Sequence, residues 1–343
     1  MPLLTADRLT DLVGRIFVAA GTPDDIAEIA ARSLVLSDLV GHESHGVVRV
    51  RQYLDALRRG DLDPTARPAI IHESGAVFTV DAHRGFGQLA ARWTMEQALV
   101  RTKAHGIAAA GLINCGHVGR LGEWVELAAD QHALALAFCN GGGASGIVAP
   151  FGGAERVLST NPIAAAIPLD GPPIVLDFAT SAVAEGKVRV ARNRGKTIPE
   201  GWVLDAKGIP TTNPQDLYDG GMLLPAAAHK GYALSLLVEY MAGVLTGNGT
   251  SALPGYRAGN GVLFIVLHGE AFRPWADYLQ TADALARRVR ETPPAPGFDE
   301  VLLPGAIEQR TEAARRAGGI QVDDATWQLL VDDAAAYAVP LDV

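Results

Sequence analysis

The sequence predicts a mixed α/β fold, in which helical segments at both ends of the chain flank a central mixed, largely non-Rossmann β-sheet. Apolar residues keep a helical spacing through about residue 75. Short runs of β-branched and small apolar residues begin at about residue 76, and helical spacing returns after about residue 272. We therefore expect two regions: a discontinuous helical region, residues 1–75 with about 295–343, and a sheet-containing region, residues 76–294.

The N-terminal part of the helical region contains three predicted helices. The apolar spacing of the first stops at Gly21, and glycine commonly ends helices because it adopts the left-handed conformation without strain. The stretch 22–25 (Thr-Pro-Asp-Asp) then offers a capping residue, a proline and early acids, which favour the start of a second helix running to about Leu39. A third helix is expected over residues 47–59.

The central region is expected to alternate strands with helices. The predicted strands are short buried runs at residues 77–80, 107–113, 134–139, 163–167, 174–178 and 262–267. Helices are expected between some of them, at residues 88–105, 121–131 and 232–246, and a last helix is expected near residues 325–337.

Composition excludes several classes of protein. The chain has 343 residues and a formal net charge of −9, and no run of lysine or arginine is long enough to follow a phosphate backbone, so we expect no nucleic-acid partner. No window approaches about 18 uninterrupted apolar residues and the N-terminus lacks a signal-peptide pattern, so we expect no membrane association. With only Cys115 and Cys139, a disulfide framework is not expected either, and these features together predict a cytoplasmic protein.

A glycine-rich run at residues 141–146 matches the G-x-G-x-x-G pattern of dinucleotide-binding loops and follows a predicted strand. The rest of that unit is missing. Pro150 and the two glycines after Phe151 would stop the helix whose N-terminus has to receive a pyrophosphate. We therefore expect a glycine turn after a strand rather than a Rossmann fold.

The first stretch that suggests chemistry is residues 41–49, Gly-His-Glu-Ser-His-Gly-Val-Val-Arg. If it is helical from its serine onward, His45, Arg49 and Tyr53 lie four residues apart on one face. A proton donor and a guanidinium, whose rigid fork suits a planar carboxylate, would then project together. The alternative is a capped helix with ordinary surface residues. No metal site is expected, because the metalloprotease spacing needs a histidine where Gly46 stands.

The second stretch is residues 114–123, where His117 precedes a predicted helix. A cationic ring is disfavoured at the positive end of a helix, so we expect the pKa of His117 to be lowered, which would keep it a usable acid or base near neutral pH. A histidine that only satisfies a loop hydrogen bond is the alternative. Cys115 is a candidate reactive thiol, whereas Cys139 lies in an apolar run and is expected in the core.

Three further polar stretches, residues 159–162, 177–181 and 229–232, lie at the ends of apolar runs or before a predicted helix. Hydroxyl and amide groups at strand ends suit ribose or phosphate contacts, although they are also common turn residues. Lys230 stands at a predicted helix N-terminus, where an anion is favoured.

Taken in order, these segments resemble the type-2 malate/L-lactate dehydrogenase family of NAD(P)-dependent, non-Rossmann enzymes. The resemblance covers about residues 34–305. It rests on SHGVVR at 44–49, CGHVGRLGEW at 115–124, APFGG at 149–153, STNPIA at 159–164, LDFATSAVAEGK at 176–187, PEGWVLDAKGIPTTNP at 199–214 and HKGYALSLLVE at 229–239. It implies a homodimer with cofactor and substrate in a cleft between domains, residues 76–294 forming the cofactor-binding domain and the helical region serving the substrate and the dimer.

The resemblance also assigns roles. His117 matches the catalytic acid/base, and Ser44, His45 and Arg49 match the group that meets the substrate. The cofactor is expected to be NAD or NADP, with NADPH favoured, and the residues around it are Thr160, Asn161, Asp177, Phe178, Ala179, His229, Lys230, Gly231, Pro304 and Gly305. One departure is the stretch 225–228 (Pro-Ala-Ala-Ala), where related chains usually carry a glycine and where three methyl groups would narrow the pocket.

We therefore expect hydride transfer between NAD(P)H and C2 of a small anionic 2-oxo or 2-hydroxy acid. Arg49 would hold the carboxylate, His117 would donate the proton during reduction, and Ser44 and His45 would position the reacting group. Reduction of a cyclic 2-imino acid of the piperideine or pyrroline carboxylate type is the alternative. A hydrolase or lyase using His45 and His117, or an inactive NAD(P)-binding sensor, would show no nicotinamide turnover.

Overall fold

The computed structural model describes residues 1–143 and 145–341. Its helices are α1 (Ala6–Ala19), α2 (Asp24–Leu39), α3 (Val50–Arg59), α4 (Gly87–His105), α5 (Leu121–Ala129), α6 (Glu185–Asn193), α7 (Gln215–Tyr218), α8 (His229–Val238), α9 (Trp275–Arg290), α10 (Ala306–Gly318) and α11 (Asp324–Ala336), with 3₁₀ turns η1 (Glu43–His45), η2 (Val47–Arg49) and η4 (Gly269–Ala271) and a π-helical turn η3 (Glu239–Val244).

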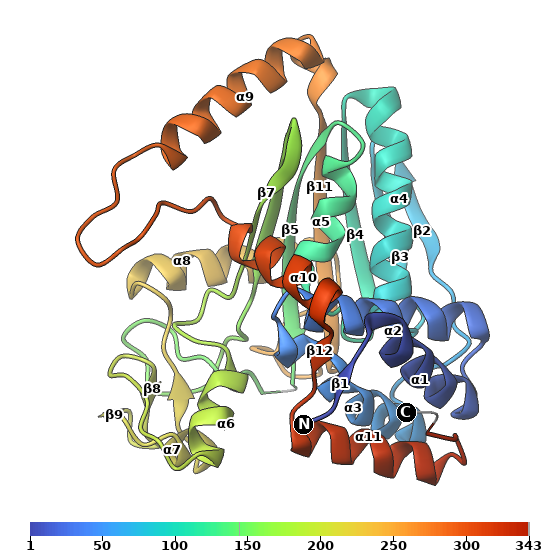
Figure 1. Ribbon diagram of the computed structural model, residues 1–343, viewed down its shortest axis with the longest axis vertical. Helices are drawn as coiled ribbons and strands as arrows, with labels where there is room; N and C mark the ends of the chain where they lie inside the picture. The colour runs from blue at the N-terminus through green and yellow to red at the C-terminus, as the bar shows by residue number, and fades with distance from the viewer. Residues whose placement is uncertain (144, 342–343) are drawn as a thin grey trace.

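The strands form one large and two small sheets. They are β1 (Leu3–Leu4), β2 (Ala69–Ser74), β3 (Val77–Asp81), β4 (Ile107–Cys115), β5 (Ala133–Gly142), β6 (Ile163–Leu169), β7 (Gly171–Phe178), β8 (Val203–Leu204), β9 (Pro210–Thr211), β10 (Met222–Leu223), β11 (Gly259–His268) and β12 (Ile320–Gln321). The large sheet has the order β2-β3-β4-β11-β5-β6-β7 (Figure 1). Only its β3–β4 pair is parallel, so the predicted mixed α/β fold is confirmed.

Strand alternation explains how this sheet is covered on both faces. Along β11, Val262, Phe264 and Val266 belong to the apolar core shared with α4 and α5, whereas Leu263 and Ile265 pack with Val238 and other residues of α8 and η3. Small side chains dominate the first face, at alanines 108, 110, 135, 137, 164 and 166. Because alanine leaves room, α4 and α5 approach the sheet closely on that face.

The two ends of the chain pack against each other. β1 pairs antiparallel with β12, with Leu4 opposite Ile320. One buried apolar cluster contains Phe17 and Leu34 from the N-terminal helices and Leu330 from α11. Figure 1 shows the red α11 lying under the blue N-terminal helices, with both termini in that part of the molecule.

A third apolar cluster lies inside the sheet-containing part of the sequence. It includes Val148, Val188 and Val203, and the three-stranded sheet β10-β8-β9 belongs to the same part of the chain. Figure 1 shows this unit, with α6 and α7, at the lower left and separate from the large sheet. Residues 76–294 therefore contain more than one packed core.

Several expected secondary-structure assignments were wrong or incomplete, and the two-residue strands β1, β8, β9, β10 and β12 were not predicted. The edge strand β2 begins at Ala69, in a part of the chain expected to be helical. It was not predicted because its side chains are mostly exposed and show no alternation of apolar and polar residues. The helix expected over 232–246 begins earlier, at His229, and its second half is the π-helical turn η3. The six predicted strands are all present.

The first two glycines of the run at 141–146 have a packing role in the fold, and residue 144 of that run lies outside the described residues. β5 extends to Gly142 and pairs with β11, and residues 145–160, which are described throughout, contain no helix. A Cβ on Gly141 would lie 2.0 Å from the carbonyl oxygen of Gly259, and Gly141 has a φ of +103°. Gly141 is therefore required by the close approach of the two strands. Within the described residues no helix has the length and apolar character needed to cross a membrane.

Candidate active site

The segment that carries Ser44, His45 and Arg49 is not the regular helix that its spacing suggested. It consists of the two 3₁₀ turns η1 and η2, separated at Gly46, and α3 begins only at Val50. The cause is the buried carboxylate of Asp38, which accepts a hydrogen bond from Val47 N at 2.9 Å. A Cβ on Gly46 would lie 1.8 Å from that carboxylate, so only glycine allows the two to pack together.

The structure nevertheless brings together Ser44, His45 and Arg49, the residues expected to meet the substrate. Ser44 Oγ lies 3.0 Å from His45 Nδ1. Arg49 donates from Nε to the backbone oxygen of Ser44 at 2.6 Å and from Nη1 to Gln52 at 2.7 Å. The Nε–H group of Arg49 thus holds the backbone of the segment 44–49, and the Nη end of the guanidinium is the part that can bind a carboxylate.

His117 joins this group from another part of the chain, the loop between β4 and α5. Its ring is stacked on the ring of His45, with centroids 5.4 Å apart and planes 21° apart. On the other side, Nδ1 lies 2.8 Å from the hydroxyl of Tyr53. His45, His117 and Tyr53 therefore form one cluster although the helical face expected to join His45 to Tyr53 is absent.

Both histidines are neutral at neutral pH in this arrangement. Removal from water lowers the pKa of His45 to about 3, with smaller contributions from the positive charge of Arg49 and from His42. Removal from water, then His45 and Arg49, lower the pKa of His117 well below its ordinary value. The direction for His117 is the predicted one, but the cause is burial and neighbouring groups and not the helix end.

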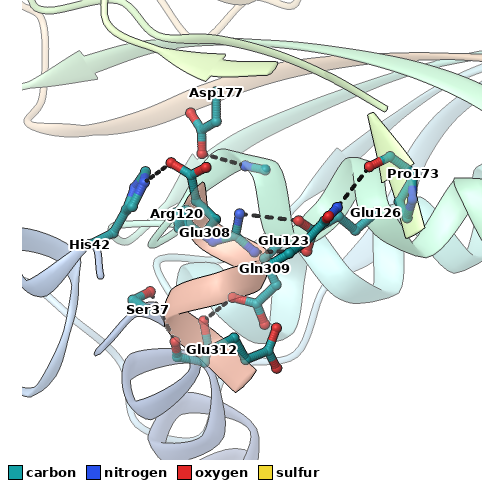
Figure 2. Close-up of polar contacts among 12 residues, drawn as sticks. Ser37, His42, Arg120, Glu123, Glu126, Pro173, Asp177, Glu308, Gln309 and Glu312 are labelled. Carbon is teal, nitrogen blue, oxygen red and sulfur yellow. Dashed lines mark hydrogen bonds and ion pairs between the residues drawn. The ribbon is translucent and has the colours of Figure 1, made fainter. Parts of the chain in front are cut away.

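The N-terminus of α5, close to His117 in sequence, is occupied by Asp177. The carboxylate of Asp177 accepts from Gly122 N at 2.7 Å, and buried Arg120 forms an ion pair with Glu126 at 2.7 Å (Figure 2). Burial raises the pKa of Asp177, against the opposing effects of the Gly122 amide and Arg120. Asp177 therefore ties the end of β7 to α5.

Three of the segments expected around the cofactor meet at Thr180. Its backbone N and its hydroxyl both donate to the carbonyl oxygen of Thr160, at 2.9 and 3.1 Å. Its carbonyl oxygen accepts from Ala226 N at 2.9 Å. A Cβ on Gly231 would lie 2.8 Å from the same Thr180 oxygen. The segments 160–161, 177–180 and 226–231 are thus held together.

The fourth segment, Pro304 and Gly305, lies beside β7. Val175 N donates to the carbonyl oxygen of Pro304 at 3.1 Å. From there α10 runs toward the segment that carries Ser44 and His45: Gln309 donates to Pro173 O at 2.9 Å, and Glu308 lies 3.2 Å from His42 Nε2 (Figure 2). α10 therefore connects the edge strand of the sheet to the segment that carries Ser44 and His45.

The exposed side chains of this region suit a dinucleotide. His229 and Lys230 are exposed in the first turn of α8, where backbone N–H groups and a lysine favour a phosphate, and the apolar ring of Phe178 is 44% exposed at the end of β7. Asn161, in contrast, is fully buried and donates to Ser235 and Glu239. Its side chain holds the segments in place.

The stretch 225–228 (Pro-Ala-Ala-Ala), where related chains are expected to carry a glycine, places two alanines in an unusual backbone conformation. Ala227 and Ala228 both have positive φ angles, +47° and +57°. Alanine is strained in that region, and glycine is not. The glycine expected at this place in related chains would thus fit the backbone that this chain adopts, and the side chains of both alanines are exposed.

Sequence reasoning missed two residues that shape the site. Asp38 holds the turn at Gly46, and Gln88 donates to the Tyr53 hydroxyl at 2.6 Å. Both are buried polar residues, and their burial became visible only in the structure, because α2 and α4 carry several other polar residues. Cys115 was wrongly considered as a reactive thiol. It is buried, donates to Asn260 O, and has its pKa raised to about 12 by burial.

The best-formed hollow and the possibility of a metal site were also compared with the positions of these residues. A hollow of about 830 Å³ lies between α1 and α2, and it is lined by none of Ser44, His45, Arg49 and His117. No group of three or more His, Cys, Asp or Glu side chains within residues 1–143 and 145–341 is placed to share a metal ion.

Comparison with known proteins gives consistent matches over nearly the whole chain. The family model described as malate/L-lactate dehydrogenase matches residues 4–331. An L-lactate dehydrogenase of Cupriavidus necator is 37% identical over 322 residues, which cover 92% of each chain. The solved structure of sulfolactate dehydrogenase from Methanocaldococcus jannaschii has a TM-score of 0.89 at 32% identity, covering 98% of each chain. That of δ1-piperideine-2-carboxylate reductase from Pseudomonas syringae pvar. tomato has a TM-score of 0.87 at 32% identity, covering 97% of this chain and 100% of the reductase.

Proposed function

Because this chain belongs to the malate/L-lactate dehydrogenase family and is an NAD(P)-dependent oxidoreductase of small 2-hydroxy acids, we propose that Ser44, His45, Arg49 and His117 form its substrate site. The observation that carries this proposal is the stacking of His45 on His117, 5.4 Å apart, beside the Arg49 guanidinium. A cation for the carboxylate and two titratable rings for the reacting oxygen are the groups that the reaction needs.

Arg49 binds the substrate carboxylate through the Nη end of its guanidinium. The charge of Arg49 is one reason that the pKa values of His45 and His117 are low. A bound carboxylate offsets that charge, so both pKa values rise when the substrate is bound. The anionic substrate thereby favours the protonated ring that reduction requires.

His117 donates the proton to the substrate oxygen as C2 is reduced, and takes it back in the oxidation. Ser44 Oγ, 3.0 Å from Nδ1 of His45, orients the His45 ring, which is stacked on the ring of His117. From this place His45 positions the reacting group of the substrate and can pass a proton toward Ser44. Both histidine side chains are half-buried, and surroundings less polar than bulk water strengthen each hydrogen bond to the substrate.

The cofactor is proposed to lie along the segments joined at Thr180 and beside β7. Phe178, Ala179, His229, Lys230, Pro304 and Gly305 would contact it, and Thr160, Asn161, Asp177 and Gly231 would hold those segments in register. When bound, the nicotinamide gives or takes the hydride. We keep NADPH as the expected cofactor, with Lys230 as a cation for its phosphates.

We also propose a homodimer in the cytoplasm. Large apolar side chains gather on one exposed face of α8, η3 and the following residue, at Leu234, Leu237, Tyr240, Val244 and Leu245. A patch of this kind on a protein surface commonly marks a protein interface. The two cysteines are free and buried, which suits a reducing compartment.

Reduction of a cyclic 2-imino acid is the second candidate. It is favoured by the likeness to the piperideine-2-carboxylate reductase structure, whose TM-score is 0.87. Arg49 would serve the carboxylate in both reactions, so a panel of substrates has to separate them.

The test is a spectrophotometric assay of purified protein with NADH and NADPH against 2-oxo acids and cyclic 2-imino acids. His117→Ala should lower kcat by roughly 10²-fold or more with the best substrate. His45→Ala serves as the comparison, since a larger loss in that variant would make His45 the donor. Near-normal turnover of the His117 variant would refute its role, and oxidation of NADPH only with imino acids would favour the second candidate.

A further inference from the structure

Two residues from separate helices, Tyr53 and Gln88, meet on the Nδ1 side of the His117 ring. Tyr53 from α3 has its hydroxyl oxygen 2.8 Å from His117 Nδ1 and 3.5 Å from the backbone oxygen of His117. Gln88 from the first turn of α4 donates from Nε2 to the same hydroxyl oxygen at 2.6 Å. Gln88 is fully buried and Tyr53 is 4% exposed, so water does not compete for these bonds.

The phenol ring of Tyr53 is held by two buried aromatic residues. Phe17 is stacked on it with centroids 6.1 Å apart, and Phe86 meets it nearly edge-on at 6.0 Å. Both phenylalanines belong to the apolar core of the helical region. The hydroxyl oxygen therefore stays at one place, and only its hydrogen can turn.

The donors and acceptors in this chain can be counted. An amide nitrogen can only donate, so Gln88 uses an acceptor site of the Tyr53 oxygen and leaves the single hydroxyl hydrogen free. Two acceptors are within its reach, His117 Nδ1 at 2.8 Å and His117 O at 3.5 Å, and the shorter bond is the stronger. Donation of the hydroxyl hydrogen to Nδ1 requires the neutral ring to carry its one hydrogen on Nε2.

We propose that Gln88 and Tyr53 are positioning residues that hold the neutral His117 ring in the tautomer with its hydrogen on Nε2. The proposal rests on the proton-donor role proposed for His117, because Nε2 is the ring nitrogen directed away from Tyr53. The resting ring thereby offers an N–H group to the substrate oxygen. This orientation is set before the substrate binds, by bonds that involve no substrate group.

The same oxygen also serves the protonated ring. When both ring nitrogens carry hydrogen, Nδ1 donates to the Tyr53 oxygen, and the hydroxyl hydrogen turns to His117 O at 3.5 Å. No heavy atom has to move. The partner is also uncharged, since burial raises the pKa of the Tyr53 hydroxyl above its ordinary value. A carboxylate in its place would hold the ring protonated, whereas a phenol lets it change state with the substrate.

Nitrogen-15 NMR of the histidine side chains in the full-length, ligand-free protein at neutral pH tests the tautomer directly. The variants are Tyr53→Phe and Gln88→Met, and the His117→Ala protein identifies the His117 signals by their loss. Tyr278→Phe is the matched control, because it removes a partly buried hydrogen bond from a tyrosine hydroxyl to Pro168 O that lies outside the site. Thermal unfolding of each variant reports whether the fold is kept.

The expected result is a wild-type His117 whose hydrogen is on Nε2, with both variants shifting the Nδ1 and Nε2 signals toward a mixture of tautomers. Tyr53→Phe should also lower kcat roughly tenfold with KM changed less than about twofold, as expected for loss of one buried hydrogen bond. Tyr278→Phe should change neither.

A wild-type ring with its hydrogen on Nδ1 would overturn the proposal, and so would unchanged His117 signals in both variants. Gln88→Met decides the matter if the Tyr53 variant fails to fold. These outcomes are separate from failure of the proposed function, which would appear as near-normal turnover of His117→Ala whatever the tautomer.

Discussion

The Asp38→Asn variant should gain stability relative to the wild type as the pH rises from 5 to 8. Asp38 is 3% exposed, and burial raises its pKa from the usual 3.8 to about 7, with repulsion from Glu43 adding to this and Val47 N and Arg315 opposing it. Asparagine keeps an oxygen that can accept from Val47 N, so the turn at Gly46 is retained.

The magnitude follows from the pKa difference. Below about pH 3.8 the carboxyl is protonated in both folded and unfolded chains. As the pH rises toward 7, the unfolded chain loses the proton and the folded chain keeps it, so the free energy of unfolding falls by about 1.4 kcal/mol for each pH unit, about 4 kcal/mol in total. The new buried amide N–H₂ costs about 1–3 kcal/mol where it lacks an acceptor. The net gain at pH 8 is therefore about 2 kcal/mol.

The assay is thermal unfolding of both proteins from pH 4.5 to 8.5 at one protein concentration, with kcat and KM measured at pH 8. The control is Asp323→Asn at the N-cap of α11, where hydrogen bonds from Thr326 and Ala325 outweigh burial and lower the pKa of Asp323. A lowered pKa stabilises above the unfolded value and that stability is lost as the pH falls, so the control should be less stable at pH 8 and approach the wild type in acid.

The reasoning is refuted if the stability difference between Asp38→Asn and the wild type does not grow between pH 5 and pH 8. A constant difference would mean that Asp38 titrates near its ordinary pKa in the folded protein. A large loss of kcat at unchanged stability would show instead that the carboxylate acts on the substrate segment in a way that an amide cannot replace.

Three further outcomes are expected. Arg49→Lys should raise KM for the carboxylate substrate roughly tenfold, because an ammonium cannot form two parallel bonds; unchanged kinetics would exclude the contact. Ala228→Gly should raise the free energy of unfolding by about 1 kcal/mol, since it relieves a strained φ of +57°, whereas Ala226→Gly should not. Leu237→Asp should shift the protein from dimer to monomer in analytical ultracentrifugation, and Val100→Asp at a more exposed apolar position on α4 should not; a wild-type monomer would contradict the dimer.

Local sequence signals predicted the main elements because those elements are long and strongly patterned. The six strands of the large sheet from residue 77 onward were found, since their runs of Val, Ile, Leu and Ala contribute to the buried apolar clusters, whereas the two-residue strands β8, β9, β10 and β12 were not predicted. β2 was missed because it is an exposed edge strand whose partner, β3, supplies its order. The division of the chain into two domains stays a prediction, and the separate core around Val148 and Val203 had no sequence signal.

The regular helix expected from Ser44 to Arg49 was wrong for a tertiary reason. Its spacing fits a helix, but the Asp38 carboxylate, buried beside Gly46, takes Val47 N as its donor and interrupts the helix there. The resulting turns still place Arg49 against the Ser44 backbone. His45 and Arg49 thus lie close together through these turns and not through a helical face, and their role in binding a substrate stays a prediction.

The sequence by itself determined which chemical groups are available: a histidine between glycines at 117, the Ser44, His45 and Arg49 set, and a glycine run that does not open a Rossmann helix. These groups depend only on the type of each residue and on its neighbours in the sequence, and the sequence gives both directly. Only the tertiary structure decided that His117 stacks on His45, that Tyr53 and Gln88 occupy its Nδ1 side, and that burial lowers its pKa. Those properties arise between segments up to 72 residues apart, such as His45 and His117, and desolvation and hydrogen-bond direction exist only once such segments have packed.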